Sequence, residues 1–175
     1  EAHNYGVFAP TLKDVHKSNL SEHIDQIYTL ITENDLKSII LVGHSYGGMI
    51  ITGIAAKTPE KISRLVYLDA ALPETGQSLF DVISSTGHDP LSFSGMESAA
   101  AFVEKLEFDP QKIQKLPKTY ILCTKSNFVD ITRFAEHKIA FDIKNWTYLE
   151  IPSSHVPQAS MPEQFAKLLL KIAEK

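Results

Sequence analysis

The stretch SIILVGHSYGGMIITGIAAK, residues 38–57, decides the fold. Its first part, 38–42, is a run of β-branched residues and leucine, typical of a strand buried on both faces of a parallel sheet. Its last part, 47–57, is apolar nearly all round and stops before a proline, which predicts a buried helix. The pentamer GHSYG (43–47) joins them. Its glycines permit a sharp strand-to-helix turn, which strains the backbone of Ser45 and lifts its hydroxyl clear of the sheet.

Outward from this stretch, short apolar runs alternate with amphipathic segments. This alternation predicts an α/β fold, a mostly parallel sheet with helices on both faces. Ser21 is expected to cap a helix before the turn, and a closing helix is expected after Pro162. We expect a single domain over 1–175, with residues 72–117, rich in proline, glycine and serine, as a cap-like insertion. The further predicted strands are residues 5–9, 64–68, 119–123 and 146–151.

Composition excludes several classes of protein. The chain has 175 residues, 17 basic and 21 acidic, with a net charge of -4 and no long basic run, so a nucleic-acid partner is not expected. Cys123 is the one cysteine, which excludes an internal disulfide framework and a cysteine zinc cluster. We expect no metal and no cofactor. The turn interrupts the apolar stretch 38–56, which therefore is no membrane span, and nothing at the N-terminus resembles a signal peptide. A cytoplasmic protein is expected, and a homodimer is compatible with the composition.

A serine hydroxyl is a poor nucleophile until a base takes its proton, so one of the seven histidines should serve Ser45. His155 follows the predicted strand 146–151 in a loop of small residues, and the carboxyl ends of parallel strands are where such sheets place their sites. His44 is expected to be structural, with its side chain pointing away from the face of the nucleophile, and His88 is a weaker candidate for a pocket wall. The histidines expected to be solvated are His3, His16, His23 and His137.

A carboxylate should then orient the imidazole and stabilise its cationic form. Asp69 ends the predicted strand 64–68 among apolar residues, and a buried aspartate there is costly unless it is paired. The other candidate is Asp130, in the segment after strand 119–123, which could instead be the N-cap of a short helix. Alternatively, Asp69 could be a structural residue whose carboxylate only caps nearby backbone N–H groups. We favour Asp69 as the acid.

With nucleophile, acid and base in this order, the chain resembles the α/β-hydrolase superfamily. The matching stretches are LVGHSYGG (41–48) and LVYLDA (65–70), followed by a histidine loop and a final helix. Small esterases are most similar: the plant methylesterase and hydroxynitrile lyase branch and bacterial pyrethroid-hydrolase-like carboxylesterases. The resemblance implies an α/β-hydrolase fold. Family members begin with further strands and a loop whose N–H completes the oxyanion hole, and we expect these N-terminal strands to be absent from the 175 residues.

The resemblance also indicates where the carboxylate that orients the histidine should lie. In much of the superfamily the acid follows the strand that here ends at Cys123, but the matching place holds Asn127. In some relatives, haloalkane dehalogenases among them, the acid follows the strand after the nucleophile helix, which is the place of Asp69. Hydroxynitrile lyases of this branch carry a lysine directly after the histidine. Val156 at that position argues against a lyase.

We therefore expect a serine hydrolase that cleaves a carboxylic ester of a small apolar substrate through an acyl-enzyme intermediate. Ser45 would attack and His155 would carry the proton. Asp69 would orient His155, and the backbone N–H of Tyr46 would donate to the oxyanion. The expected pocket walls in the cap-like insertion are Leu79, Phe80, Phe93 and Met96. The alternatives are a non-catalytic ligand-binding or interaction protein on a hydrolase scaffold and, less favoured, a hydroxynitrile lyase.

Overall fold

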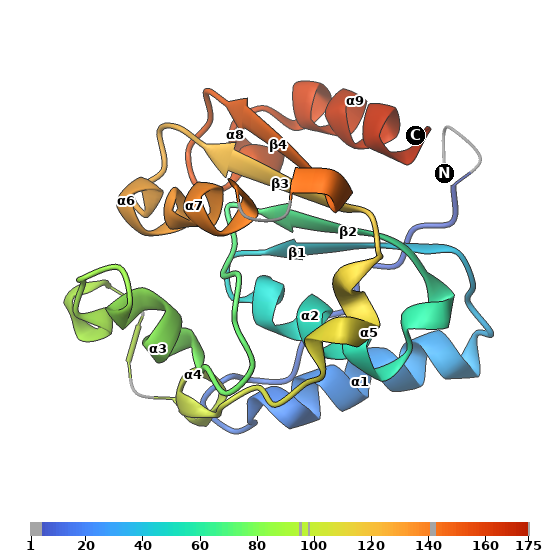
Figure 1. Ribbon diagram of the computed structural model, residues 1–175, viewed down its shortest axis with the longest axis horizontal. Coiled ribbons are helices and arrows are strands. Elements are labelled where there is room, and N and C mark those ends of the chain that lie inside the picture. Colours follow the sequence, from blue (N-terminus) through green and yellow to red (C-terminus); the bar gives the residue numbers. More distant parts are fainter. Residues whose placement is uncertain (1–4, 95, 98, 141–142, 175) are drawn as a thin grey trace.

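The computed structural model describes residues 5–94, 96–97, 99–140 and 143–174. Within these ranges the strands form one four-stranded parallel sheet in the order β1-β2-β3-β4 (Figure 1). Because spatial order follows chain order, each strand end lies beside the next. The strands are β1 (Ile39–His44), β2 (Ile62–Leu68), β3 (Lys118–Cys123) and β4 (Trp146–Ile151).

Helices cover both faces of this sheet (Figure 1). On one face α2 packs against β1 and β2 and α1 packs against α2, and on the other face α9 packs against the sheet. The longer helices are α1 (Leu20–Glu33), α2 (Gly47–Lys57) and α9 (Pro162–Ala173). The shorter helices are α3 (Leu79–Ser84), α4 (Ala100–Val103), α5 (Pro110–Gln114), α6 (Val129–Thr132), α7 (Phe134–Ala140) and α8 (Pro157–Ser160).

Strand β2 shows how the sheet divides the core. Leu65 and Tyr67 join the apolar cluster of the α1 and α2 face, whereas Val66 and Leu68 join that of the α9 face, and all four are at most 1% exposed. Alternate side chains of a strand point to opposite faces, so a strand with both faces covered must be apolar throughout. The predicted α/β class with a parallel sheet is thus confirmed, and α2 and β4 have the predicted bounds.

Two predicted details are wrong. Residues 5–9 form no strand: Val7 and Phe8 are 68% and 50% exposed, and the segment pairs with no strand of the described chain. An apolar run alone makes no strand, because the backbone needs a neighbour to complete its hydrogen bonds. The N-cap of α1 is Asn19 and not Ser21. The Asn19 side chain accepts the Glu22 N–H, and the Glu22 carboxylate accepts the Asn19 N–H in return, which is a capping box.

Residues 72–117 leave the sheet after β2 and return to it at β3, and they carry α3, α4 and α5. An antiparallel bridge between Gln77 and Leu106 closes this excursion at its base. Glu104 ties it to α1, because its carboxylate accepts hydrogen bonds from both the backbone N–H and the hydroxyl of Ser21. In Figure 1 the arrowheads of the strands point to the side where α3, α6 and α7 lie.

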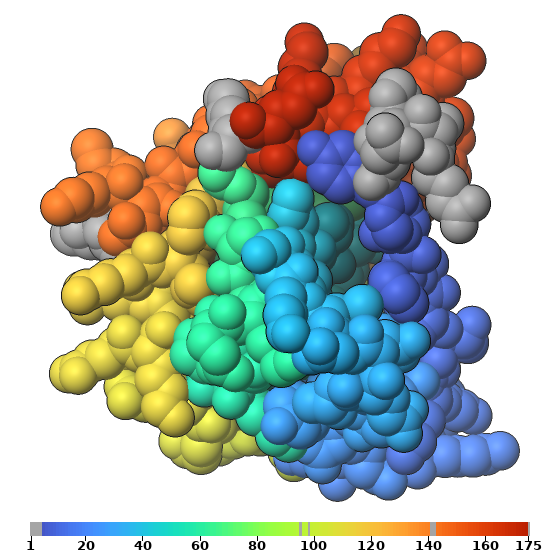
Figure 2. Space-filling view, turned by 90° about the vertical axis from the view of Figure 1, so that its right-hand side faces the viewer, coloured from blue at the N-terminus to red at the C-terminus, as the bar shows by residue number. Residues whose placement is uncertain are grey.

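The opposite side of the molecule, which the amino ends of the strands face, is seen in Figure 2. There the first described residues, in blue, lie beside the C-terminal helix α9, in red. Among the described residues, no helix combines the length and apolar character that crossing a membrane requires.

Candidate active site

Ser45 occupies a strained turn between β1 and α2. Its φ is +55°, in the left-handed region that residues with a side chain rarely adopt. Hydrogen bonds from the neighbouring strand end hold it there: the Ser45 N–H donates to the Leu68 carbonyl (3.2 Å), and the Ala71 N–H donates to the Ser45 carbonyl (3.0 Å). The predicted sharp strand-to-helix turn is therefore present.

Of the two glycines in the pentamer, Gly43 is required because backbone passes too close for a side chain, whereas a Cβ at Gly47 would meet nothing within 4 Å; the second glycine that is required is Gly48. A Cβ at Gly43 would lie 2.5 Å from the Gly47 carbonyl oxygen, and a Cβ at Gly48 would collide with the Ala71 carbonyl. The glycines thus let β1, α2 and the segment after β2 converge on the serine.

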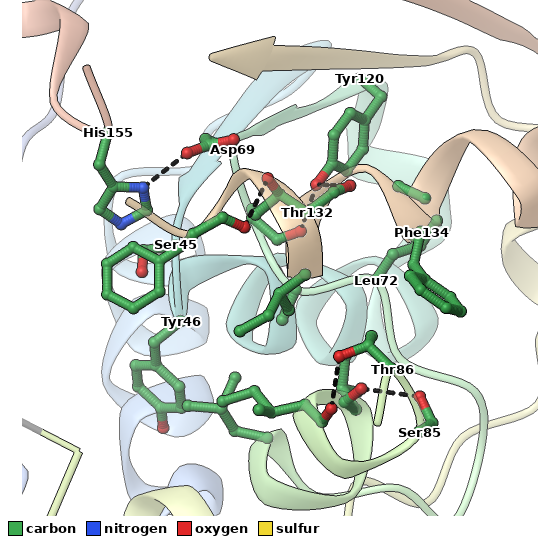
Figure 3. A pocket seen from close by; sticks show the side chains of 18 of the residues that line it. Ser45, Tyr46, Asp69, Leu72, Ser85, Thr86, Tyr120, Thr132, Phe134 and His155 are labelled. Atoms are coloured by element: carbon green, nitrogen blue, oxygen red, sulfur yellow. Dashed lines mark hydrogen bonds and ion pairs between the residues drawn. The ribbon is translucent and has the colours of Figure 1, made fainter. Parts of the chain in front are cut away.

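Asp69 and His155 form the central pair of the site (Figure 3). Asp69 follows β2 with a φ of +43° and is completely buried, and its Oδ2 lies 2.7 Å from His155 Nδ1. Its other oxygen accepts the Cys123 N–H (3.2 Å). A carboxylate can only accept, so Nδ1 of His155 carries a proton, and in the neutral ring Nε2 keeps its lone pair.

The charge of Asp69 is stabilised by its neighbours. Burial raises the pKa of this carboxyl, but the hydrogen bonds from His155 and the Cys123 N–H, together with the nearby hydroxyls of Ser126 and Thr132, outweigh burial and bring the pKa below its usual range. Asp69 is therefore an anion at neutral pH, as a group that orients and stabilises an imidazolium must be.

The structure separates the two aspartates considered as the acid. Asp130 is exposed and lies inside the first turn of α6, and the N-cap of that helix is Phe128. The interpretation of Asp130 as an N-cap is thus wrong, because the helix begins at Val129, two residues earlier than such a cap requires. Asn127 is also exposed, whereas Ser126 is buried with its Oγ 3.4 Å from His155 Nδ1.

Tyr46 is held from the side of α1 by a histidine that was expected to be solvated. His23 is fully buried; its Nδ1 lies 3.0 Å from the Tyr46 hydroxyl and its Nε2 lies 3.0 Å from the Lys13 carbonyl. The expectation failed although the helical spacing of Leu20 and Ile24 places position 23 on the same buried face.

The other histidines divide as follows. His16 and His137 are exposed, as expected, and His3 lies outside the described residues. His88 does not line the cavity described below; it contacts Thr86 and the ring of Phe93. The side chain of His44 lies against His155, a contact that the sequence did not reveal.

A cavity of about 270 Å³ extends from the three candidate residues toward α3 and α7 (Figure 3). Ser45, Asp69 and His155 line one end of it. Most of its remaining wall is apolar and comes from residues between 70 and 102 and from residues between 128 and 138; examples are Leu72, Val82, Phe102, Phe128, Ile131 and Phe134.

Two of the four expected pocket residues belong to this wall. Leu79 and Met96 line the cavity, whereas Phe80 and Phe93 do not appear among its described lining residues. Phe80 follows Leu79 on α3, and adjacent residues of a helix point in different directions. Its ring stacks on Phe102.

The polar side chains of the far wall are already bonded within the protein. The hydroxyls of Ser85, Thr86 and Thr132 each donate to a backbone carbonyl three or four residues earlier. Lys138 forms an ion pair with Glu74 (3.2 Å). The far wall therefore presents mainly carbon to an occupant. No cluster of three or more histidine, cysteine or acidic side chains that could hold a metal ion occurs in the part of the chain described.

Known proteins are similar to this chain in sequence or in fold. A carbendazim hydrolyzing esterase of Nocardioides sp. (strain SG-4G) is 50% identical over 64 residues, which are 37% of this chain and 26% of the esterase. Methylesterase 8 of Arabidopsis thaliana is 30% identical over 116 residues, 63% of this chain and 41% of that protein. The matched regions thus span well under half of these curated relatives.

Among solved structures, a pyrethroid hydrolase of Sphingobium faniae JZ-2 superposes with a TM-score of 0.71 at 20% identity, covering 99% of this chain and 88% of that one. Polyneuridine aldehyde esterase superposes with a TM-score of 0.68 at 17% identity, covering 91% and 80%. At such identities the likeness concerns the fold alone. The family model described as alpha/beta hydrolase fold matches residues 3–173. This chain therefore belongs to the α/β-hydrolase family, and its relatives include esterases.

Proposed function

We propose that this chain is a serine hydrolase of carboxylic esters that works through an acyl-enzyme, with Ser45, His155 and Asp69 as its triad. The observation that carries the proposal is the 2.7 Å contact between Asp69 Oδ2 and His155 Nδ1 at the cavity end that Ser45 also lines. This contact leaves Nε2 as the ring's basic atom. The Ser45 hydroxyl makes no hydrogen bond with another described residue.

The chemistry follows in two balanced steps. In the first, Ser45 Oγ bonds to the ester carbonyl carbon while His155 Nε2 takes the hydroxyl proton; the C–O bond to the alcohol then breaks, and the imidazolium returns the proton to the departing alkoxide. In the second, water replaces the serine by the same route and releases the acid. Asp69 stays ionised throughout and stabilises the imidazolium.

The oxyanion of each tetrahedral intermediate needs N–H donors. Tyr46 is the N-cap residue of α2, and its backbone N–H has no acceptor among the described residues. The N-terminus of a helix also carries a partial positive charge that favours a developing anion. Tyr46 N–H is thus our proposed donor.

The cavity supports an apolar substrate. Its far wall offers few free hydrogen-bonding groups, so a polar atom buried there would lose its hydration without compensation. We propose that residues 72–117 act as a cap within a single domain, with Leu79 and Met96 contacting the acyl or alcohol part of a small ester.

A fluorophosphonate probe tests the assignment directly. The probe should label Ser45, and Ser45→Ala should abolish both labelling and hydrolysis of p-nitrophenyl butyrate, with a loss of about 10⁴–10⁶ in kcat. Ser94→Ala, at an exposed position, is the matched control and should behave as wild type. A folded wild-type protein that takes no label and hydrolyses no ester would instead favour a non-catalytic binding protein.

A further inference from the structure

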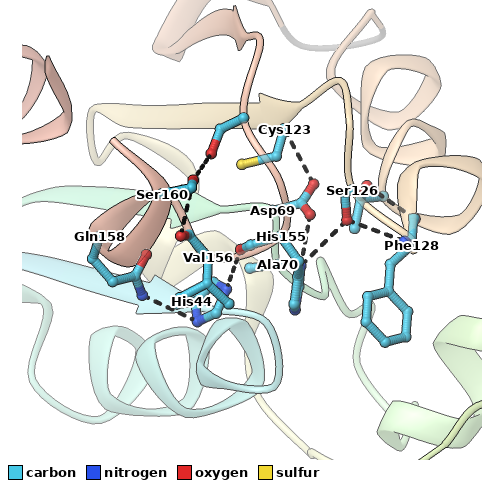
Figure 4. A network of polar contacts seen from close by, with 12 residues as sticks. His44, Asp69, Ala70, Cys123, Ser126, Phe128, His155, Val156, Gln158 and Ser160 are labelled. Carbon is cyan, nitrogen blue, oxygen red and sulfur yellow. Dashed lines mark hydrogen bonds and ion pairs between the residues drawn. The ribbon is translucent and has the colours of Figure 1, made fainter. Parts of the chain in front are cut away.

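His44, the last residue of β1, reaches from the nucleophile turn to the loop after β4 (Figure 4). Its Nε2 lies 2.7 Å from the backbone carbonyl oxygen of His155. A carbonyl oxygen can only accept, so Nε2 of His44 carries the proton and donates it. The residue before the nucleophile is thereby bonded to the backbone of the candidate base.

The other ring nitrogen fits the same tautomer. Nδ1 of His44 lies 3.4 Å from the Gln158 side-chain nitrogen, a long contact in which the amide is the donor. Both polar atoms of the His44 ring thus face the segment that carries His155. His44 is half-buried in this position.

His44 also packs on the imidazole itself. The ring centroids of His44 and His155 are 4.5 Å apart, and those of Phe128 and His155 are 4.7 Å apart. Figure 4 shows His44 and Phe128 on either side of His155. The hydrogen bond to Asp69 fixes one edge of the imidazole, and these two rings restrict its remaining rotation.

The charge of His44 suits this place. Burial lowers the pKa of His44, and repulsion by His155 lowers it further; the hydrogen bond to the His155 backbone and the charge of Asp69 oppose this and are outweighed. The titratable groups that act on His44 are His155 and Asp69, and its other neighbour, Gln158, is neutral. At neutral pH His44 is therefore uncharged and does not repel His155 when that ring takes a proton.

We propose that His44 is a positioning residue for the general base: its Nε2–H holds the His155 carbonyl, and its ring packs on the imidazole and restricts its rotation. This inference rests on the proposed hydrolase function. Misplacing a reacting group by about 1 Å can cost roughly 10²-fold in rate, so loss of this contact should lower kcat and leave substrate binding nearly unchanged.

Two amides of different reach provide the test. The side-chain nitrogen of His44→Gln can occupy the place of Nε2 and still donate to the His155 carbonyl, whereas that of His44→Asn is too short. We expect kcat on p-nitrophenyl butyrate to fall about 10²-fold in the Asn variant, with KM within about twofold of wild type, and to recover at least about tenfold in the Gln variant. His16→Gln, at an exposed histidine, is the control and should match wild type.

A spectroscopic readout separates this inference from the hydrolase proposal. The proton NMR signal of His155 Nδ1–H, which lies in the hydrogen bond to Asp69, should be sharp in wild type and in the Gln variant and broadened in the Asn variant. If wild type is inactive, the hydrolase proposal fails, and this signal still tests the positioning. Folded Asn and Gln variants with equal kcat and an unchanged signal, or an Asn variant within threefold of wild-type kcat, would overturn the role of His44.

Discussion

The loops after β2 and β3 lie side by side, and both touch His155, but they contribute different chemistry. The first brings Asp69, fully buried and 2.7 Å from Nδ1, whereas the second brings Ser126, whose hydroxyl is 3.4 Å from the same atom. The carboxylate next along the second loop, Asp130, is exposed. The comparison teaches that two adjacent strand ends can reach the same imidazole, and that of the two aspartates considered as the acid the buried one is the one in contact with it.

The largest expected effect comes from removing the charge of the first loop. Asp69→Asn keeps the shape but presents an amide that favours the wrong imidazole tautomer, so kcat should fall by up to about 10⁴ on a p-nitrophenyl ester. Fluorophosphonate labelling of Ser45 should slow in parallel. A variant that keeps a tenth of the wild-type kcat would show that the acid lies elsewhere.

A second test asks whether a carboxylate in the loop after β3 can replace that of Asp69. In the Asp69→Asn background, Ser126→Asp places a carboxylate next to His155 Nδ1, and we expect it to restore about 10–10² of the lost kcat, because a carboxylate from either loop can select the Nδ1–H tautomer. Ser126→Asn in the same background has nearly the same shape without charge and is the matched control. Equal rates for the two double variants would argue that the loops are not interchangeable.

The stabilisation that Asp69 contributes to the folded protein should depend on pH. The pKa of Asp69 is lowered in the folded protein, mainly by hydrogen bonds that outweigh burial, so its ionised form stabilises the fold above the unfolded pKa of about 3.9. That contribution is lost as pH falls through the lower, folded pKa. The difference in unfolding free energy between wild type and Asp69→Asn should therefore be larger at pH 7 than at pH 3 in urea titrations. A difference that is independent of pH would mean that Asp69 is not ionised in the fold.

The smallest effect is expected at the exposed aspartate. Asp130→Asn should leave kcat unchanged and alter the unfolding free energy by no more than about 0.5 kcal/mol, since Asp130 neither caps α6 nor touches His155. Thermal melts and one ester assay beside Asp69→Asn check this. Loss of turnover in Asp130→Asn would show that Asp130, and not Asp69, is the acid.

The features best predicted from the sequence are those formed by residues that are contiguous in the chain. The turn around Ser45 is encoded by a strand, two glycines and a helix that are contiguous in the chain, so its pattern indicates the backbone conformation that the structure shows. The sequence also places Asp69 and His155 directly after strands, and the structure brings the two side chains into contact. Parallel order brings such strand ends to one edge of the sheet.

What escaped prediction depends on contacts between distant segments. The partners of His23 and His44 lie in other parts of the chain, and no local pattern names them. Phe80 and Leu79 are neighbours of similar character, and only the orientation of α3 decides which of them faces the cavity. The run 5–9 has the composition of a strand, but pairing with another segment is what makes a strand.

The joining of Asp69 to His155 spans 86 residues of sequence and crosses from the end of β2 to the loop after β4. A refolding molecule can form the local turn at Ser45 early, yet it has no base until the last strand has docked on β3. Turnover would then be a late signal in refolding, recovering after helix content has returned. If the chain is the ester hydrolase proposed above, the return of ester hydrolysis would report when β4 has docked on β3, an event that a measurement of helix content does not report.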